Sequence, residues 1–312
     1  MIFLLFLVQF STAFQILDIN IEIEIHPESC AEDSIVALVH SAPKNIELRN
    51  TVRQTWGQNQ KTIFVLGQSS IDPEIQNEAS KFNDILQFDF IDAYRNMTYK
   101  HLSGYYYMLN HCAKTKYILK SDDDQAIDTF HLPHYLSNFI EYDKFYLCLI
   151  MTGIEQKPQR DPKSKWYVSY EDYEHESYPD FCSGWAYVTS LKTMNRILDV
   201  SKNHSYFWID DMFVTGMLAQ KVRDEILVYD WRNNFLTDHI QSQESFLYGK
   251  FFTPEIMVAS DLEINEMVHM FKKFKNCDSK KCFEMIYNDP KNKDIMKPPS
   301  RHFAKLQTRT EL

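Results

Sequence analysis

Glycine is scarce in this chain of 312 residues, and its 7 glycines never stand closer than ten positions apart. Loops that wrap a phosphate group in backbone amides, of the Walker type and of the dinucleotide type, need glycines clustered in one turn. The sequence therefore excludes both types of loop. It also has no Cys-x-x-Cys pair, so a structural zinc site is not expected.

The chain has fewer basic than acidic residues, 33 against 43, and a net charge of −10. This balance argues against a broad basic face that grips nucleic acid, and a negatively charged substrate would need a local cation. The content of 44% hydrophobic and 24% charged residues is that of a folded globular chain, which excludes disorder and a fibrous fold.

Long apolar runs are missing except near the amino terminus. Residues 1–17 carry no charge, and residues 1–8 are continuously apolar. A helix over residues 1–17 would reach about 26 Å against a hydrocarbon core of about 30 Å, which is short for a membrane span. We expect a cleaved signal peptide or a short signal-anchor, either of which directs the chain to the secretory pathway, with a buried core strand as the alternative.

Six cysteines and two glycosylation sequons fit that route. In a secreted protein, an even number of cysteines allows up to three disulfides with fifteen pairings, and Cys277 and Cys282 are spaced to close a small local loop. The sequons begin at Asn96 and Asn203 and add slight support for the lumen of the secretory pathway.

Short β-rich runs alternate with helical patterns along the chain. Strands are expected at 35–40, 62–66, 85–89, 117–120 and 146–151, and helices at 46–56, 73–82 and 97–113. This alternation predicts an α/β fold in which helices cover both faces of a mostly parallel sheet. Ligands of such sheets bind beyond the carboxyl ends of the strands.

The apolar strand at 117–120 runs directly into three carboxylates, those of Asp122, Asp123 and Asp124. Adjacent like charges repel one another, so the cluster costs stability unless a cation or solvent compensates it. Carboxylate oxygens suit Mg²⁺ or Mn²⁺, and such an ion would in turn hold the phosphates of a nucleotide. The alternative interpretation is a solvated acidic turn.

A second acidic pair, Asp210 and Asp211, stands between an aromatic run and an apolar helical segment. Carboxylates at the start of a helix are stabilised by its positive end, so helix capping is one interpretation. The other is a general base, because apolar neighbours partly desolvate a carboxylate and raise its proton affinity.

Six segments of the chain follow one another in a set order. They are Arg-Asn-Thr-Val-Arg-Gln-Thr-Trp-Gly at 49–57, Phe-Val-Leu-Gly at 64–67, the block from Asp84 to Lys100, Lys-Ser-Asp-Asp-Asp at 120–124, Tyr-Pro-Asp-Phe-Cys-Ser-Gly-Trp-Ala-Tyr-Val-Thr-Ser at 178–190, and Asp-Asp at 210–211. Together they resemble the motifs of the β-1,3-glycosyltransferases of family 31, which include β-1,3-galactosyl- and N-acetylglucosaminyltransferases and Fringe relatives. The order of all six is far more specific than any one motif.

The resemblance implies a GT-A fold, a Rossmann-like sheet that binds a UDP-sugar at its strand ends with Mn²⁺ held through Asp-x-Asp. It also implies an inverting transfer of a hexose, galactose or N-acetylglucosamine, to the 3-hydroxyl of a glycan on a glycoprotein or glycolipid. One carboxylate then takes the proton of the acceptor hydroxyl. The expected location is the Golgi lumen, with the membrane as a partner through an uncleaved amino terminus and with no nucleic acid.

The resemblance assigns roles to individual residues. Asp211 is the expected catalytic base, Asp124 and Asp122 are the expected metal ligands, and Asp122 and Asp123 contact the metal or the donor ribose. The other residues expected near the nucleotide are Arg49, Arg53, Asp89 and Lys100. For the three cations, an ordinary surface ion pair is the alternative. Two tryptophans are candidate sugar platforms, although core burial is the commoner fate of this residue: Trp56 and Trp185.

The sequence departs from the family pattern in three places. Where the family has a metal-binding His before a Glu-Met pair, this chain has Ser260 and Asp261. We expect either that the aspartate substitutes as an oxygen ligand or that the metal is bound more weakly. Ala186 replaces a glycine, and Asp210 replaces the glutamate of Glu-Asp-Val. These changes leave open an inactive relative, a lumenal protein that binds a glycan or a partner without transfer. A third interpretation, a metal-dependent phosphohydrolase, lacks the histidines such sites gather.

The expected organisation is one folded domain with short flanking segments. Residues 1–17 are the signal peptide or signal-anchor, 18–33 a short stem, 34–275 the GT-A glycosyltransferase domain, and 276–312 a C-terminal tail rich in Lys, Asn and Pro. No repeat and no low-complexity stretch interrupts the expected domain.

Overall fold

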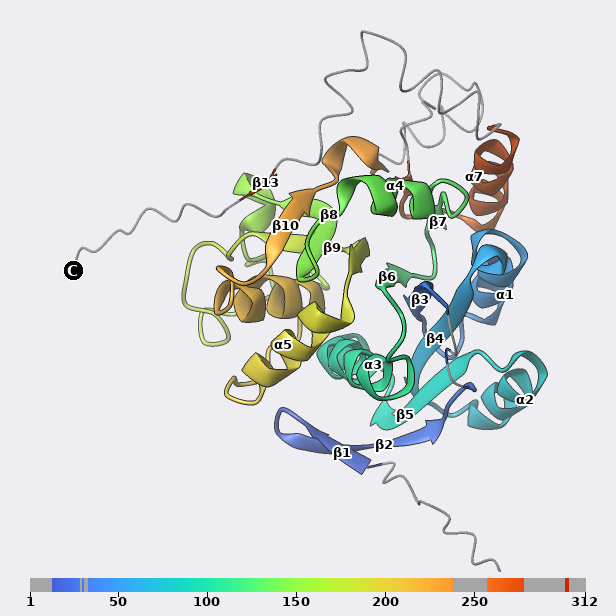
Figure 1. The fold of residues 1–312 in the computed structure, drawn as a ribbon. Coiled ribbons are helices and arrows are strands. Elements are labelled where there is room, and N and C mark those ends of the chain that lie inside the picture. Colours follow the sequence, from blue (N-terminus) through green and yellow to red (C-terminus); the bar gives the residue numbers. More distant parts are fainter. Residues whose placement is uncertain (1–12, 29, 31–32, 238–256, 278–300, 303–312) are drawn as a thin grey trace, which may run out of the picture.

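The computed structural model describes residues 13–28, 30, 33–237, 257–277 and 301–302, which build one large sheet flanked by helices (Figure 1). The ten strands of this sheet lie in the order β1-β2-β5-β4-β3-β6-β9-β8-β10-β13. Their bounds are β1 (Ala13–Ile16), β2 (Ile19–Ile25), β3 (Ile35–His40), β4 (Lys61–Gln68), β5 (Ile85–Ile91), β6 (Tyr117–Asp122), β8 (Phe145–Met151), β9 (Phe181–Thr189), β10 (Leu227–Asp230) and β13 (Arg301–His302). A small second sheet joins β11 (Phe235–Leu236), β12 (Val258–Ala259) and β7 (Ala126–Ile127).

The middle of the large sheet is parallel. β5, β4, β3 and β6 pair in parallel, and β9 then runs antiparallel between β6 and β8. From β3 the chain moves outward through β4 to β5 and then crosses back to β6, on the other side of β3. The strand order therefore reverses between β3 and β6, and ligands of open α/β sheets bind at such a switch point.

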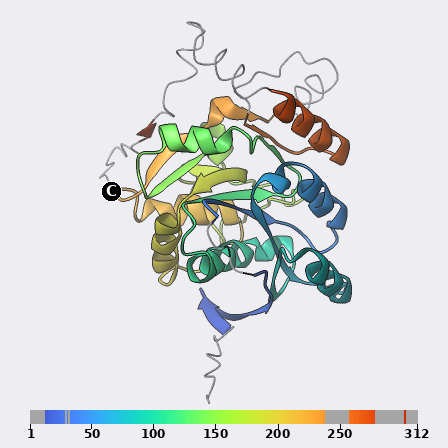
Figure 2. The ribbon, with the colours of Figure 1, turned by 45° about the vertical axis from the view of Figure 1, so that its right-hand side comes forward.

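Helices cover both faces of the sheet, and Figure 2 shows α3 on one side with α4 (green) and α7 (red-brown) on the other. Along β3, Val36 and Leu38 pack toward α3 and α5, whereas Ala37 and Val39 pack toward α1, α2, α4 and α7. The helices are α1 (Ile46–Gln54), α2 (Asp72–Phe82), α3 (Met97–His111), α4 (Leu132–Phe139), α5 (Leu191–Ser201) and α7 (Ile264–Asn276). The short helices are η1 (Trp56–Asn59), η2 (Tyr94–Asn96), η3 (Gly153–Gln156), the π-helical η4 (Met212–Leu218) and η5 (Arg232–Asn234).

The expected α/β class, with helices on both faces of a mostly parallel sheet, is confirmed. Each expected strand and helix is present within a few residues of its expected bounds. The strands were predictable from the sequence because parallel strands are buried on both faces and therefore appear as continuous apolar runs. All six residues of β3 are buried.

The sheet also includes residues that we assigned to the leader and the stem. β1 and β2 form an antiparallel pair at one edge, and β2 continues the sheet onto β5. Phe14 and Ile16 of β1 are buried, and the ring of Phe14 stacks on that of Tyr106 at 3.7 Å. The folded sheet thus extends to Ala13, upstream of the boundary expected at residue 34, because alternate side chains of β1 face the core. Residues 1–12 lie outside the described part.

Two disulfides tie distant segments together, Cys30 to Cys112 and Cys148 to Cys182. Cys277 is also disulfide-bonded, whereas Cys282 lies outside the described residues. Disulfides persist in oxidising compartments, so these bonds support the secretory pathway. Across the described ranges, the helices are all too short or too polar to cross a bilayer. Of the expected tail, the structure describes 276–277 and the two residues of β13.

Candidate active site

A cavity of about 730 Å³ opens beyond the carboxyl ends of β3 and β6, at the switch point of the sheet. Its walls come mainly from the loop at 40–45, the turn at 69–71, the segment 92–97 and the acidic turn at 122–124. His40 and Asp122 are register partners on β3 and β6, so both strand ends open on the same cavity. This is where the topology predicts a ligand.

The three carboxylates of the acidic turn have different partners. Asp123 is nearly buried and accepts hydrogen bonds from Ser41 Oγ at 2.6 Å and Asn45 Nδ2 at 3.0 Å, which fix it against the loop after β3. Asp122 Oδ1 lies 2.8 Å from Nζ of Lys120. The side chain of Asp124 accepts from the neighbouring Gln125 amide. Asp123 is therefore held by two donors of the protein, which leaves its two neighbours better placed to meet a ligand.

The carboxylates of Asp122 and Asp124 fit a hard divalent cation. Burial, with a further contribution from Asp124, raises the pKa of Asp122 to about 7, although Lys120 opposes the shift. Burial and the charge of Asp123 also raise the pKa of Asp124. A raised pKa indicates that the surrounding protein only partly compensates the negative charge of a carboxylate. A divalent cation that prefers oxygen ligands would complete the compensation. The donor set of Asp122 and Asp124 therefore suits Mn²⁺ or Mg²⁺.

Asp211 stands at the start of η4 and is fixed by two backbone amides. Its Oδ1 accepts from Met212 N at 2.7 Å, and its Oδ2 accepts from Gly184 N of β9 at 3.0 Å. A Cβ at Gly184 would lie 3.2 Å from Oδ2, so glycine allows this close approach. Burial and the charge of Asp210 raise the pKa of Asp211 to about 7. The carboxylate is thus a helix cap with the proton affinity that a general base needs.

The neighbouring Asp210 has the opposite electrostatic character. Its Oδ2 lies 2.7 Å from Nδ1 of His101 and 3.9 Å from Nδ1 of His40. Burial alone would raise its pKa, but the hydrogen bond and charge of His101 lower the pKa overall. Adjacent carboxylates whose proton affinities differ in this way divide into one that stays ionised and one that can exchange a proton.

Lys120 connects the two acidic groups. Its side chain is 1% exposed and donates to Asp122 and to the carbonyl oxygen of Gly184. Burial lowers the pKa of this lysine, but the nearby carboxylates raise it overall, namely those of Asp122, Asp210 and Asp211. The acidic turn and the Asp210–Asp211 pair, far apart in sequence, therefore share one electrostatic environment.

The two arginines expected near the nucleotide are paired within the protein instead. Arg49 is fully buried and donates two hydrogen bonds to Glu78, at 2.8 and 2.6 Å. It also donates to the carbonyls of Ala42 and Pro43, at 2.6 and 3.0 Å. Arg53 donates to Asp84 and Glu78. Neither arginine lines the cavity, and carboxylates already neutralise both, so Arg49 acts on the site by holding the loop after β3.

Asp89 and Lys100 lie in different places. Asp89, on β5, accepts a hydrogen bond from the backbone amide of Glu22 at 2.8 Å, at the edge formed with β2 and away from the cavity. Lys100 lines the cavity, but its Nζ is bound to Ser41 O at 2.6 Å and to Asp92 at 2.7 Å. The structure therefore brings Lys100 to the site and leaves Asp89 out.

The two tryptophans differ as well. Trp56 is fully buried, and its indole nitrogen donates to Gln125 O at 2.7 Å, directly after the acidic turn. A buried ring is no platform for a sugar, so this expectation was wrong for Trp56, whose place in the core supports the turn. Trp185 on β9 is half-buried, next to Gly184, and remains a candidate.

The sequence model of one protein family, described as Galactosyltransferase, matches residues 47–228, which is more than half of the chain. The chain belongs to this galactosyltransferase family. The matched stretch contains the acidic turn and both Asp210 and Asp211. The resemblance expected from the six motifs is thereby confirmed, and the chain is a member of a glycosyltransferase family.

Named relatives agree with this membership. Human beta-1,3-galactosyltransferase 5 is 31% identical over 225 residues, 69% of this chain and 68% of its own length. Human lactosylceramide 1,3-N-acetyl-beta-D-glucosaminyltransferase is 34% identical over 63% of this chain and 57% of its own length. Among solved structures, galactosyltransferase LgtC aligns over 78% of this chain and 98% of its own, with a TM-score of 0.39 and 7% identity, too low to carry a conclusion.

The departure from the galactosyltransferase pattern at Ser260 can be placed in the structure. Ser260 is buried, and its backbone amide donates to Leu236 O at 3.1 Å. The next residue, Asp261, is exposed, and its charge contributes to the raised pKa of Asp124, after burial and Asp123. The following amide, of Leu262, donates to the backbone carbonyl of Asp124 at 3.0 Å. Asp261 therefore lies next to the segment that is hydrogen-bonded to the acidic turn and stays a candidate for the substitute oxygen ligand.

Two histidines of the site were missed by the sequence reasoning. His40 is the last residue of β3 and lines the cavity, so the rule that ligands bind at strand ends was a signal for it. His101 lies within α3, where nothing in its sequence neighbourhood indicates contact with Asp210 more than a hundred positions later.

Proposed function

We propose that this chain is an active inverting β-1,3-glycosyltransferase that moves galactose or N-acetylglucosamine from a UDP-sugar to the 3-hydroxyl of an acceptor glycan. The proposal rests on one observation above others: Asp211 is a half-buried carboxylate whose pKa is raised to about 7, held in a fixed orientation near an acidic turn that suits a divalent cation. A protein that only binds a glycan has no need of a base.

The donor side of the site is assigned to the cavity at the switch point. Asp122 and Asp124 would hold Mn²⁺, which when bound neutralises the charge of the diphosphate leaving group. Asp123 is fixed by Ser41 and Asn45, and Lys100 is fixed by Ser41 and Asp92, so these residues shape the wall against which the nucleotide lies. Preorganised polar groups of this kind position a substrate without reorganising on binding.

The acceptor side is assigned to Asp211. Its two oxygens accept from Gly184 N and Met212 N, which holds the carboxylate plane in one orientation. With a pKa near 7, the carboxylate takes the proton of the acceptor hydroxyl more readily than an ordinary aspartate does. Asp210 stays ionised beside it and steadies the acceptor or the start of η4.

The relatives and the disulfides support two finer parts of the proposal. One relative is named for lactosylceramide, so a glycolipid acceptor is included in the proposal beside a glycoprotein acceptor. The two described disulfides support a lumenal site, and we place the enzyme in the Golgi lumen, anchored through its amino terminus if residues 1–17 are retained.

A lumenal binding protein without transferase activity is the second candidate. The observation that favours it is the buried Ser260 at the position where the family has a metal-binding His. In that case UDP and Mn²⁺ would bind weakly, and no sugar would be transferred.

A donor and acceptor screen tests the proposal. The purified chain is incubated with a panel of UDP-sugars and glycan acceptors, with and without Mn²⁺, and products are analysed for linkage. We expect one donor to be used, a β-1,3 product, and loss of turnover on metal chelation. Transfer should persist in Asp143→Asn, a surface carboxylate paired with Lys192, and should disappear in Asp211→Asn. Absence of transfer by the parent across the whole panel, with UDP still bound, would favour the binding protein.

A further inference from the structure

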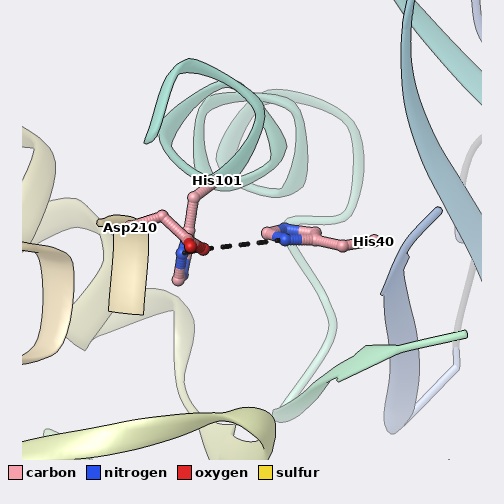
Figure 3. A group of neighbouring side chains, drawn as sticks. All are labelled: His40, His101 and Asp210. Atoms are coloured by element: carbon pink, nitrogen blue, oxygen red, sulfur yellow. Dashed lines mark hydrogen bonds and ion pairs between the residues drawn. The ribbon is translucent and has the colours of Figure 1, made fainter. Parts of the chain in front are cut away.

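Three side chains meet beside the cavity, and two of them, the histidines, have no role in the proposed transfer: His40 at the end of β3, His101 from α3 and Asp210 from the segment before η4 (Figure 3). One ligand atom from each lies within 4.8 Å of the others. Asp210 Oδ2 stands between the two rings, 2.7 Å from Nδ1 of His101 and 3.9 Å from Nδ1 of His40. The rings are nearly perpendicular, at 84°, with centroids 5.0 Å apart.

His40 gives the independent sign of a missing ligand. Its side chain is 1% exposed, yet among the described residues neither ring nitrogen has a hydrogen-bond partner. Buried polar atoms are nearly always paired, because an unsatisfied one loses its hydration without replacement. The ring points toward Asp210 (Figure 3) and also borders the cavity, so a ligand can reach it.

The charges of the three groups suit a cation. Burial, followed by the charge of Lys120, holds the pKa of His40 well below its usual value, so the ring is neutral and offers a lone pair. Asp210 stays ionised. Lys120 does not cancel this charge alone, because its own ammonium is already bound to Asp122 and to the carbonyl of Gly184. The group therefore combines two imidazole rings with one carboxylate, whose ligand atoms all lie within 4.8 Å of one another.

A chain of tyrosines behind His101 supplies the support that metal-binding histidines usually have. Nε2 of His101 is hydrogen-bonded to the hydroxyl of Tyr187, which lies 2.5 Å from that of Tyr105, and Tyr105 lies 3.5 Å from the hydroxyl of Tyr146. Hydroxyls can reverse the direction of such a chain. The ring proton of His101 can then move from Nδ1 to Nε2, which frees Nδ1 for a metal without net loss of a proton.

We propose that His40, His101 and Asp210 form a cation site of their own, for a borderline divalent metal of the Zn²⁺ or Co²⁺ class, separate from the acidic turn. Two nitrogens and one carboxylate oxygen are a donor set that such metals prefer, whereas the oxygens of Asp122 and Asp124 suit Mn²⁺ or Mg²⁺. Three protein ligands also leave a coordination position for water or substrate. This site does not depend on the proposed transfer reaction.

Cobalt absorption tests the proposal directly. Co²⁺ is titrated into the purified full chain in the presence of excess Mg²⁺, which occupies oxygen-only sites, and the visible bands of low-coordinate Co²⁺ are recorded. We expect one equivalent to bind and Zn²⁺ to displace it. His40→Ala should remove the bands, and Tyr187→Phe should weaken binding by about tenfold to a hundredfold, because it removes the partner of a ligand. The exposed His175→Ala is the matched control and should bind as the parent does.

The variants separate the proposal from its rivals. His40 has no hydrogen bond to lose among the described residues, so His40→Ala should melt near the parent and any lost Co²⁺ binding is not a folding defect. Asp124→Ala should keep the bands. Bands that vanish in Asp124→Ala but survive in His40→Ala would assign the metal to the acidic turn and overturn the proposal. Bands that vanish in His175→Ala would show that Co²⁺ binds at the protein surface, and the absence of bands in the parent would reject the proposed site.

Discussion

Lys120 Nζ lies 2.8 Å from Asp122 Oδ1, and the same buried ammonium also interacts electrostatically with the carboxylates of Asp210 and Asp211. One cation thus serves as counter-ion to carboxylates that come from β6 and from the start of η4. Because an uncompensated charge is costly in a protein interior, the proposed donor side and the proposed acceptor side of the site depend on the same side chain.

Replacing that cation should destabilise the protein. Lys120→Met removes the buried counter-ion of three partly exposed carboxylates. Removing one partner of a fully buried pair costs about 3–5 kcal/mol, and because the Asp122 side chain is 35% exposed and water screens part of the charge, we expect a smaller loss. Urea unfolding measures the loss of unfolding free energy. Mn²⁺ should restore more stability to this variant than to the parent, because the ion supplies the missing positive charge. Lys192→Met, which removes a surface pair with Asp143, is the control and should change little. Equal losses in both variants would contradict the shared counter-ion.

The metal assignment is tested at Asp124. Asp124→Ala should abolish Mn²⁺-dependent UDP binding in calorimetry, while the fold persists, because removing one of several like charges relieves repulsion. The matched control Asp143→Ala should bind UDP as the parent does. Unchanged UDP affinity in Asp124→Ala would remove this residue from the metal site.

The base assignment predicts an order between two neighbours. Asp211→Asn should bind UDP-sugar and Mn²⁺ nearly as the parent does but transfer roughly 10² to 10⁴ times more slowly. Asp210→Asn should retain measurable turnover, because Asp210 is already committed to His101. Initial rates at saturating donor, together with donor affinity, separate the two. The reverse order of rates would make Asp210 the base.

Acid should weaken the Arg49–Glu78 pair in a defined direction. Burial alone would raise the pKa of Glu78, but the hydrogen bonds and charges of Arg49 and Arg53 lower it below its ordinary value of about 4.5. The ionised pair therefore contributes stability above about pH 4.5, and this contribution is lost as the pH falls through the lower pKa of the folded state. Glu78→Gln should be less stable at neutral pH and show a shallower loss on acidification. Parallel acid-unfolding curves would argue against this role.

Glycosylation should favour Asn203 over Asn96. Asn203 is exposed after α5, whereas Asn96 donates its amide to Ile91 O at 2.9 Å and the hydroxyl of Thr98 is bound to Phe207 O. Asn203→Gln should remove the endoglycosidase-sensitive mass of the secreted chain on a gel, and Asn96→Gln should leave it. An unglycosylated product from a secretory host would oppose the lumenal location.

The central sheet was predictable because each of its inner strands is marked by an apolar run in its own segment of the sequence. The runs at 35–39 of β3, 63–66 of β4 and 117–119 of β6 are continuously apolar, and the acidic turn begins at the last residue of β6. β1 was hidden because it is four residues long and follows an apolar segment that is also typical of a leader. The position of the cavity beyond the strand ends was predictable from the topology alone.

The partners of charged groups were less predictable. Arg49 matches a motif, but no feature near it shows that Glu78, twenty-nine positions later, neutralises it. The same holds for Asp89, which bonds to a strand that sequence reasoning placed outside the domain. Long-range pairing of charges depends on the packing of α1, α2 and β2, which periodicity does not specify.

The antiparallel β9, inserted between β6 and β8, has a consequence for how the enzyme is assembled. β6 and its acidic turn pair with β3, which precedes them in the chain, but the amide of Gly184 that orients Asp211 arrives only with β9. The residues that line the cavity all precede β9 in the chain, whereas the amide that orients Asp211 follows them. A chain that ends before β9 therefore carries the lining of the cavity but lacks both Asp211 and the strand that fixes its orientation.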